Sequence, residues 1–171
     1  MKKWRVLVLI GLFYALMFSI SSFAEGLPSY KVVCKNITDI PNWTGSECSG
    51  MNESGTPMGD IVTASRDYEK KDKAFHVSVI SGMQAMASWM PFATNINIET
   101  DENVVKTLTI QDYRAGLSYD KKEKSGGIFI CLKTENNQCK VIFGTSFENM
   151  KYEDALDLIK NFDLKSISGI F

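Results

Sequence analysis

Histidine is the scarcest catalytic residue type in this sequence, because the 171 residues include only His76. Nucleophilic catalysis of the Ser-His or Cys-His kind would have to use this residue, which falls in the middle of an alternating, strand-like segment. The sequence also has no Gly-x-Ser-x-Gly motif, no glycine-rich phosphate-binding loop and no His-Glu-x-x-His motif. These absences argue against an enzyme. A small enzyme would need a pocket that brings His76 together with a carboxylate and a nucleophile.

Positive charge and long apolar runs are also in short supply. After residue 24 the chain has 16 Lys and Arg against 20 Asp and Glu, a net charge of about −4. Nucleic-acid binding needs a basic face, so the sequence argues against a nucleic-acid partner. No apolar run after residue 24 reaches the roughly 18 residues of a membrane span, so none is expected in the mature chain.

The first 24 residues have the three-part pattern of a secretory signal peptide. A basic start is followed by an apolar run over residues 6–20, and small residues stand at Ser22 and Ala24. We predict that residues 1–24 are a signal peptide cleaved near Ala24, and that the protein is exported to the periplasm or the outside and soluble there. The short Met-Lys-Lys start favours a bacterial origin, with a eukaryotic secretory route as the alternative.

The mature chain has a loop-rich arm and one domain, which together form one unit. The arm covers residues 25–60, where residues 29–34 indicate a short strand and residues 49–60 a loop. Residues 61–171 form a single α+β domain. Strands are expected at 61–69, 74–80, 104–110, 114–119, 128–132 and 138–143.

Two helices are predicted, one at about 82–90 that is capped by Ser81, and one at about 150–162 that is capped by Asn149. Residues 163–167 are expected to be a short packed tail. The fold class is α+β: an antiparallel, meander-like sheet of five to seven strands, with both helices packed on one face.

The four cysteines lack any Cys-x-x-Cys spacing, which argues against a redox pair or a zinc site. With a three-residue loop at 134–136, Cys131 and Cys139 would lie directly opposite each other in a hairpin. Cys34 and Cys48 would then pair in the arm. Four cysteines allow three connectivities, and we favour Cys34–Cys48 with Cys131–Cys139 because both bridges close local loops.

Methionines in the first predicted helix allow three interpretations. Met83, Met86 and Met90 share one helical face, which is typical of an ordinary core helix. The same face also suits an adaptable surface for a protein partner or an apolar ligand. That surface would consist of Met83, Met86, Trp89, Met90 and Phe92. The third interpretation is a Cu(I) site made by Met83, Met86 and Met90 with His76, because thioethers are soft ligands.

Residues 64–68, 75–82, 154–156 and 162–165 resemble a group of small exported bacterial proteins with no assigned activity. The resemblance implies export and a single α+β domain, and it transfers no site residue. The order of strands with helices on one face is also similar to that of PsbP/Mog1-like sandwiches, which are accessory and binding proteins rather than enzymes.

Taken together, the sequence predicts a non-catalytic exported binding or accessory module that acts through a protein partner or an apolar ligand, without a cofactor. The alternative is a periplasmic soft-metal protein that binds Cu(I) through its methionine cluster.

Overall fold

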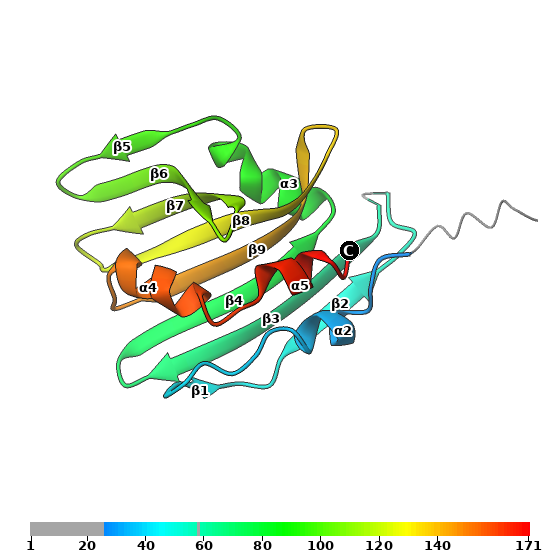
Figure 1. Cartoon of the computed structure of the whole chain (residues 1–171), viewed down its shortest axis with the longest axis horizontal. Coiled ribbons are helices and arrows are strands. Elements are labelled where there is room, and N and C mark those ends of the chain that lie inside the picture. Colours follow the sequence, from blue (N-terminus) through cyan, green and yellow to red (C-terminus); the bar gives the residue numbers. More distant parts are fainter. Residues whose placement is uncertain (1–25, 58) are drawn as a thin grey trace, which may run out of the picture.

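The computed structural model describes residues 26–57 and 59–171. The predicted signal peptide at 1–24 lies outside the described residues. The described part forms one open antiparallel sheet with helices on both of its faces (Figure 1). No helix within this part is long and apolar enough to cross a membrane.

The sheet has nine strands in the described part, more than the five to seven predicted. They are β1 (Thr44–Gly45), β2 (Ser49–Glu53), β3 (Ile61–Lys70), β4 (Lys73–Ser81), β5 (Asn97–Glu99), β6 (Asn103–Ile110), β7 (Tyr113–Asp120), β8 (Ser125–Glu135) and β9 (Gln138–Glu148). The helices are α2 (Tyr30–Cys34), α3 (Met83–Trp89), α4 (Tyr152–Ile159) and α5 (Leu164–Ser168), and a 3-10 helix, η1 (Met90–Phe92), continues α3.

The strand order is β1-β3-β4-β9-β8-β7-β6-β5, and β2 pairs with β3 beside β1. The meander prediction is correct for β5 through β9, which are joined to their neighbours by short turns. It is wrong at β9, because this last strand enters between β4 and β8 rather than at an edge. The chain must therefore cross the sheet between β4 and β5, and α3 and η1 make that crossing.

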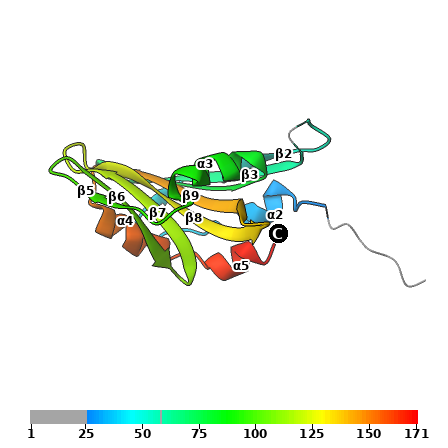
Figure 2. The same ribbon diagram turned by 90° about the horizontal axis from the view of Figure 1, so that it is seen from above.

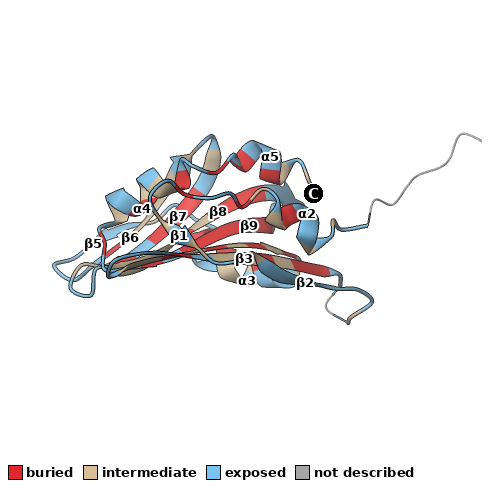
Figure 3. Cartoon of the chain, turned by 90° about the horizontal axis from the view of Figure 1, so that it is seen from below, coloured by how far each residue is buried: buried red, intermediate tan, exposed pale blue. Residues whose placement is uncertain are grey.

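The sheet buries side chains on both faces, but unequally. On the larger core, alternate residues such as Val77 and Phe143 pack against α2, α4 and α5 (Figure 3). On the opposite face, α3 and η1 cover a smaller core that includes Phe129 and Ile142. Figure 2 shows α3 on one side of the sheet and α4 with α5 on the other. The prediction that both helices share one face is wrong, because α3 belongs to the crossing from β4 while α4 and α5 follow β9.

Both predicted helix caps are also wrong. The Ser81 hydroxyl accepts a hydrogen bond from the Val62 N–H at 2.8 Å inside the sheet, and the N-cap residue of α3 is instead Gly82, whose φ is 81°. Asn149 has a φ of 57°, and its amide donates to the Asp72 carbonyl at 2.6 Å. Helix α4 begins three residues later, at Tyr152, and its N-cap residue is Lys151.

The arm is more regular than predicted. Residues 29–34 are not a strand: Ser29 caps the helix α2, with its hydroxyl accepting from the Lys31 N–H at 3.3 Å, and Val33 is fully buried. Part of the predicted loop is β2, which pairs with β3 along residues 61–65. The arm is therefore built onto the sheet. The predicted tail is likewise the helix α5, capped by Asp163, which accepts from the Ser166 N–H at 2.9 Å.

Two disulfides connect the predicted cysteine pairs: Cys34–Cys48 with a Cα separation of 5.7 Å, and Cys131–Cys139 with 5.8 Å. The predicted hairpin register is wrong, however. The turn is the two-residue Asn136-Asn137, with both φ angles positive, and a β-bulge near Lys133 brings Cys131 opposite Ile142. Disulfides that persist are typical of an oxidising compartment.

Candidate functional site

The crossing segment α3–η1 (residues 83–92), called here the platform, contains all five residues predicted to form a binding surface. It can lie flat on the sheet because of Gly116 in β7. A Cβ atom at this position would overlap the ring of Phe92, so only glycine lets η1 settle here.

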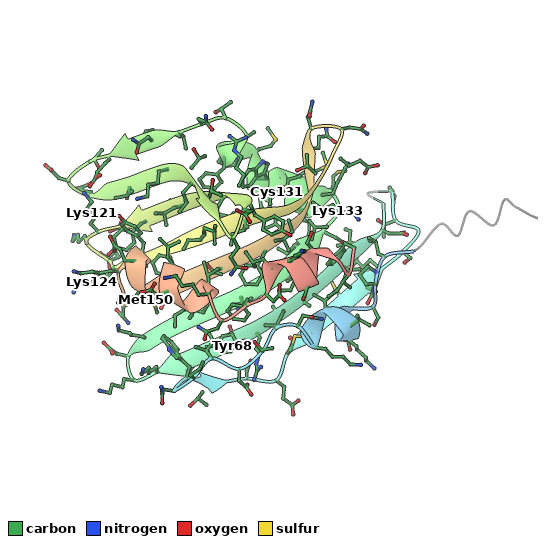
Figure 4. All side chains as sticks on the ribbon, in the orientation of Figure 1. Tyr68, Lys121, Lys124, Cys131, Lys133 and Met150 are labelled. Carbon is green, nitrogen blue, oxygen red and sulfur yellow. A yellow bond between two sulfur atoms is a disulfide. The ribbon has the colours of Figure 1, made fainter. Side chains whose placement is uncertain are left out.

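Two aromatic side chains anchor the platform from beneath. Trp89 is 8% exposed and Phe92 is 4% exposed. Phe92 stacks on Phe129 with ring centroids 5.7 Å apart, and its centroid lies 6.2 Å from that of Trp89. Burying each ring contributes about 1.5–3 kcal/mol, so the platform is held firmly to the sheet. Cys131 belongs to the same small core and lies next to α3 (Figure 4).

The methionines point away from that anchor. The buried stripe of the platform is Ala85, Trp89 and Phe92, one residue out of phase with Met86 and Met90 and so rotated by about 100°. Met90 is 74% exposed and Met83 is 42% exposed, while Met86 is half-buried. The structure therefore divides the predicted surface: two aromatics face the sheet and the methionines face outward. The ordinary-core interpretation does not hold for Met83 and Met90.

The contacts around the methionines bear on the Cu(I) alternative. The Nζ atom of Lys140 lies 3.7 Å from the Met86 sulfur, and a cation on that sulfur would be repelled by the ammonium group. On β4, Ile80 packs against the small core that α3 covers. His76 is four residues before Ile80, so it lies about 13 Å from Ile80 along the strand. The structure thus does not bring His76 to the methionines. In the described ranges no group of three His, Cys, Asp or Glu side chains is placed to hold a metal ion.

His76 instead has a partner that the sequence analysis missed. Its Nδ1 atom lies 2.6 Å from Oδ1 of Asp67 on β3. In the sheet register Asp67 pairs with His76, and His76 pairs with Ser146 of β9, so a carboxylate, an imidazole and a hydroxyl form one row. The strands predicted at 61–69 and 74–80, joined as a hairpin, would already place Asp67 opposite His76. The position of Ser146 depended on the unpredicted place of β9.

This row lacks what nucleophilic catalysis needs. The His76 side chain is 39% exposed and that of Asp67 is 68% exposed, on an open part of the sheet. Ser146 makes no hydrogen bond to the ring among the described residues, and none of the clefts reported below is lined by these three residues. The row is open to water, so this arrangement gives the enzyme interpretation no support.

Two clefts lie in this region. One of about 850 Å³ lies beside β5 and β6, and one of about 540 Å³ is lined by Trp89 of the platform and by the Cys131–Cys139 bridge. Asp112 and Arg114 line both of them. The Arg114 guanidinium donates to the Asn95 side-chain oxygen at 3.2 Å and lies 5.7 Å from the centre of the Trp89 ring. Arg114 therefore lies between the two clefts and adds a cationic group next to Trp89 of the platform.

No protein-family model, curated protein or solved structure matches this chain. The resemblance to small exported bacterial proteins stays a prediction. The similarity to PsbP/Mog1-like sandwiches assumed helices on one face, whereas the described sheet carries helices on both.

Proposed function

We propose that this protein is a non-catalytic exported binding module whose platform docks an apolar surface of a protein partner. The observation that carries the proposal is the outward exposure of Met83 and Met90, at 42% and 74%, on a segment fixed to the sheet by buried aromatics. Exposed methionines on a rigid helix are an adaptable contact surface, because the unbranched thioether side chain repacks easily against different neighbours.

A protein partner fits this surface better than a small apolar ligand. Small ligands bind in concave sites that bury most of their surface, whereas Met83 and Met90 stand on the outward side of a helix. A projecting apolar helix face suits a groove or a flat apolar patch on another protein. Lys140, whose ammonium group lies 3.7 Å from the Met86 sulfur, would favour a partner with acidic residues around its apolar contact.

The test is photo-cross-linking in the source cells, with the photoreactive amino acid placed at position 90. The control is position 51, because Met51 on β2 is an exposed methionine outside the platform, and its exposure of 46% lies between those of Met83, 42%, and Met90, 74%. We expect position 90, and not position 51, to cross-link one recurring protein. With that protein purified, Met83→Lys combined with Met90→Lys should weaken binding at least about tenfold, and Met51→Lys should leave it unchanged. Equal cross-linking from both positions, or equal loss of binding in both variants, would refute the proposal.

Cu(I) binding by the methionines is the second candidate, because Met83 and Met90 leave two sulfur atoms accessible. Its test is an anaerobic Cu(I) titration of the purified protein with a competing chelator. Stoichiometric binding that is lost on Met83→Leu with Met90→Leu would place copper ahead of the protein partner.

A further inference from the structure

Among the residues that the structure describes, strand β6 has an unpaired edge at its carboxyl end. Its partner β5 pairs only with residues 104–106 of β6, while β6 continues to residue 110. Thr107 still donates its N–H to the Ile96 carbonyl at 2.9 Å. Backbone groups of successive residues point to opposite sides of a strand, so the N–H and C=O of Thr109 point the same way as those of Thr107. At Thr109, however, β5 no longer faces them.

The larger cleft lies at this edge. Its lining includes Lys106 and Leu108, whose side chains face the larger core, and Thr107 and Thr109, whose side chains face the opposite side. A cleft of about 850 Å³ that reaches both faces of a sheet at its edge has the place and shape of a missing strand. It is open because the chain between η1 and β5 approaches β6 only at Ile96 (Figure 1).

We propose that residues 108–110 of β6 bind an extended peptide segment by β-augmentation, with Thr109 exchanging two backbone hydrogen bonds with the central peptide residue. The proposal rests on the proposed function in that the peptide belongs to a protein partner, but it concerns a different contact from the methionine surface.

The lining also defines the chemistry of the peptide. Side chains of an added strand alternate between the two faces, so the residue opposite Thr109 would lie on the Arg114 side and its two neighbours on the Leu108 side. Arg114 reaches over β6 to Asn95 and uses one of its five N–H donors there. Against the single carboxylate of Asp112, Lys106 and Arg114 leave the cleft with excess positive charge. The matching peptide therefore has an acidic central residue with an apolar residue on each side. This pattern is the same whether the peptide runs parallel or antiparallel to β6.

A second copy of the chain fits the edge less well. Antiparallel self-pairing about Thr109 would bring the Arg114 guanidinium groups of both copies to the same side of the same short ladder, where they repel each other. Three residues of edge also offer far less contact than the roughly 1,000 Å² expected of a stable dimer.

The probe is the synthetic peptide acetyl-Ser-Val-Glu-Val-Ser-amide, titrated into isotope-labelled protein and followed by NMR. We expect amide shift changes confined to residues 107–110 and Arg114, with a dissociation constant of about 1 mM. Replacing the central Glu by Lys, or methylating its backbone nitrogen, should weaken binding at least about tenfold.

The protein variant is Thr109→Pro, which removes the outward N–H but no hydrogen bond to β7, so the fold should persist while peptide binding is lost. Met90→Lys is the control and should leave peptide binding unchanged. This control therefore distinguishes a failure of the β-augmentation proposal from a failure of the proposed methionine docking surface.

If the amide shifts of residues 107–110 do not change at a peptide concentration of about 5 mM, the proposal is overturned. So would equal binding of the N-methylated peptide, or unchanged binding by Thr109→Pro. A dimer detected by sedimentation and abolished by Thr109→Pro would identify a second copy as the occupant and would also overturn it.

Discussion

The close approach of Phe92 to Gly116 makes a sharp prediction about stability. Gly116→Ala adds a methyl group where the Phe92 ring lies, so the ring must leave the small core or η1 must shift. Phe92→Ala, which removes the ring outright, should cost about 3–5 kcal/mol of unfolding free energy. Gly116→Ala can cost no more than releasing that ring, and we expect a loss of about 2–4 kcal/mol.

The double variant tests the cause. In the Phe92→Ala background the methyl group of Gly116→Ala enters space that the ring has vacated, so it should cost almost nothing. The two substitutions should therefore show a coupling energy of about 2–4 kcal/mol, the whole cost of Gly116→Ala alone. Their sum would greatly overstate the effect of the double variant.

The assay is urea unfolding followed by tryptophan fluorescence and far-ultraviolet circular dichroism, with near-ultraviolet dichroism reporting on Trp89. Gly169→Ala is the matched control, because a Cβ atom there meets its nearest neighbour at an ordinary 3.4 Å. We expect that control to be nearly neutral. Additive costs of Gly116→Ala and Phe92→Ala, within about 0.5 kcal/mol, would refute the reasoning.

Two further predictions concern the larger core. The Thr145 hydroxyl is buried between β4 and β8 and has no hydrogen-bond partner in the described part of the chain. Thr145→Val should therefore stabilise the protein by about 1–2 kcal/mol in urea unfolding; a loss of stability would contradict this. Burial raises the pKa of Tyr68 from 10.0 to about 12, and its hydroxyl donates to the Thr38 carbonyl at 2.6 Å. Because unfolded tyrosine ionises first, stability should fall as the pH rises from 10 to 12. Tyr68→Phe should cost about 1 kcal/mol near neutral pH and should reduce that alkaline fall; equal falls in both proteins would contradict the expectation.

The elements that could be predicted from sequence are those whose local pattern decides their structure. Alternation of apolar and polar residues indicates β3 and β4 on either side of a charged turn, and the spacing of Ala155, Ile159 and Phe162 indicates the last long helix. The paired cysteines belong here too, because short loops favour their local bridges.

The arm could not be predicted in this way, since tertiary contacts decide its conformation. Val32 and Val33 favour a strand by propensity, yet they lie in a helix because Ser29 caps it and Val33 is fully buried against the sheet. Strand β2 contains no apolar alternation, and all its residues are exposed; it forms because the edge of β3 offers backbone partners.

The candidate site was predictable in composition but not in orientation. Helical spacing identified Met83, Met86 and Met90 as one face, but not whether that face or the neighbouring one with Trp89 meets the sheet. The answer depends on Gly116, which is about 25 residues away in sequence and admits Phe92. The open edge at Thr109 could not be predicted, because nothing in the sequence indicates that β5 pairs only with residues 104–106 of β6 and not with the rest of that strand.

The position of β9 has a consequence for the order in which this protein can fold. Strand β9 forms eight residue pairs with β4, from which it is separated by more than fifty residues, and pairs with β8 on its other side. Until residues 138–148 are available, β3 with β4 and β6 through β8 are two partial sheets, each with an open edge. Closing the long loop between them is an entropic cost that local turns do not carry, so sheet closure should be the slow folding event. A chain that emerges from its amino end would thus expose both open edges until nearly all of it has appeared, which is when unpaired strands are most prone to associate wrongly.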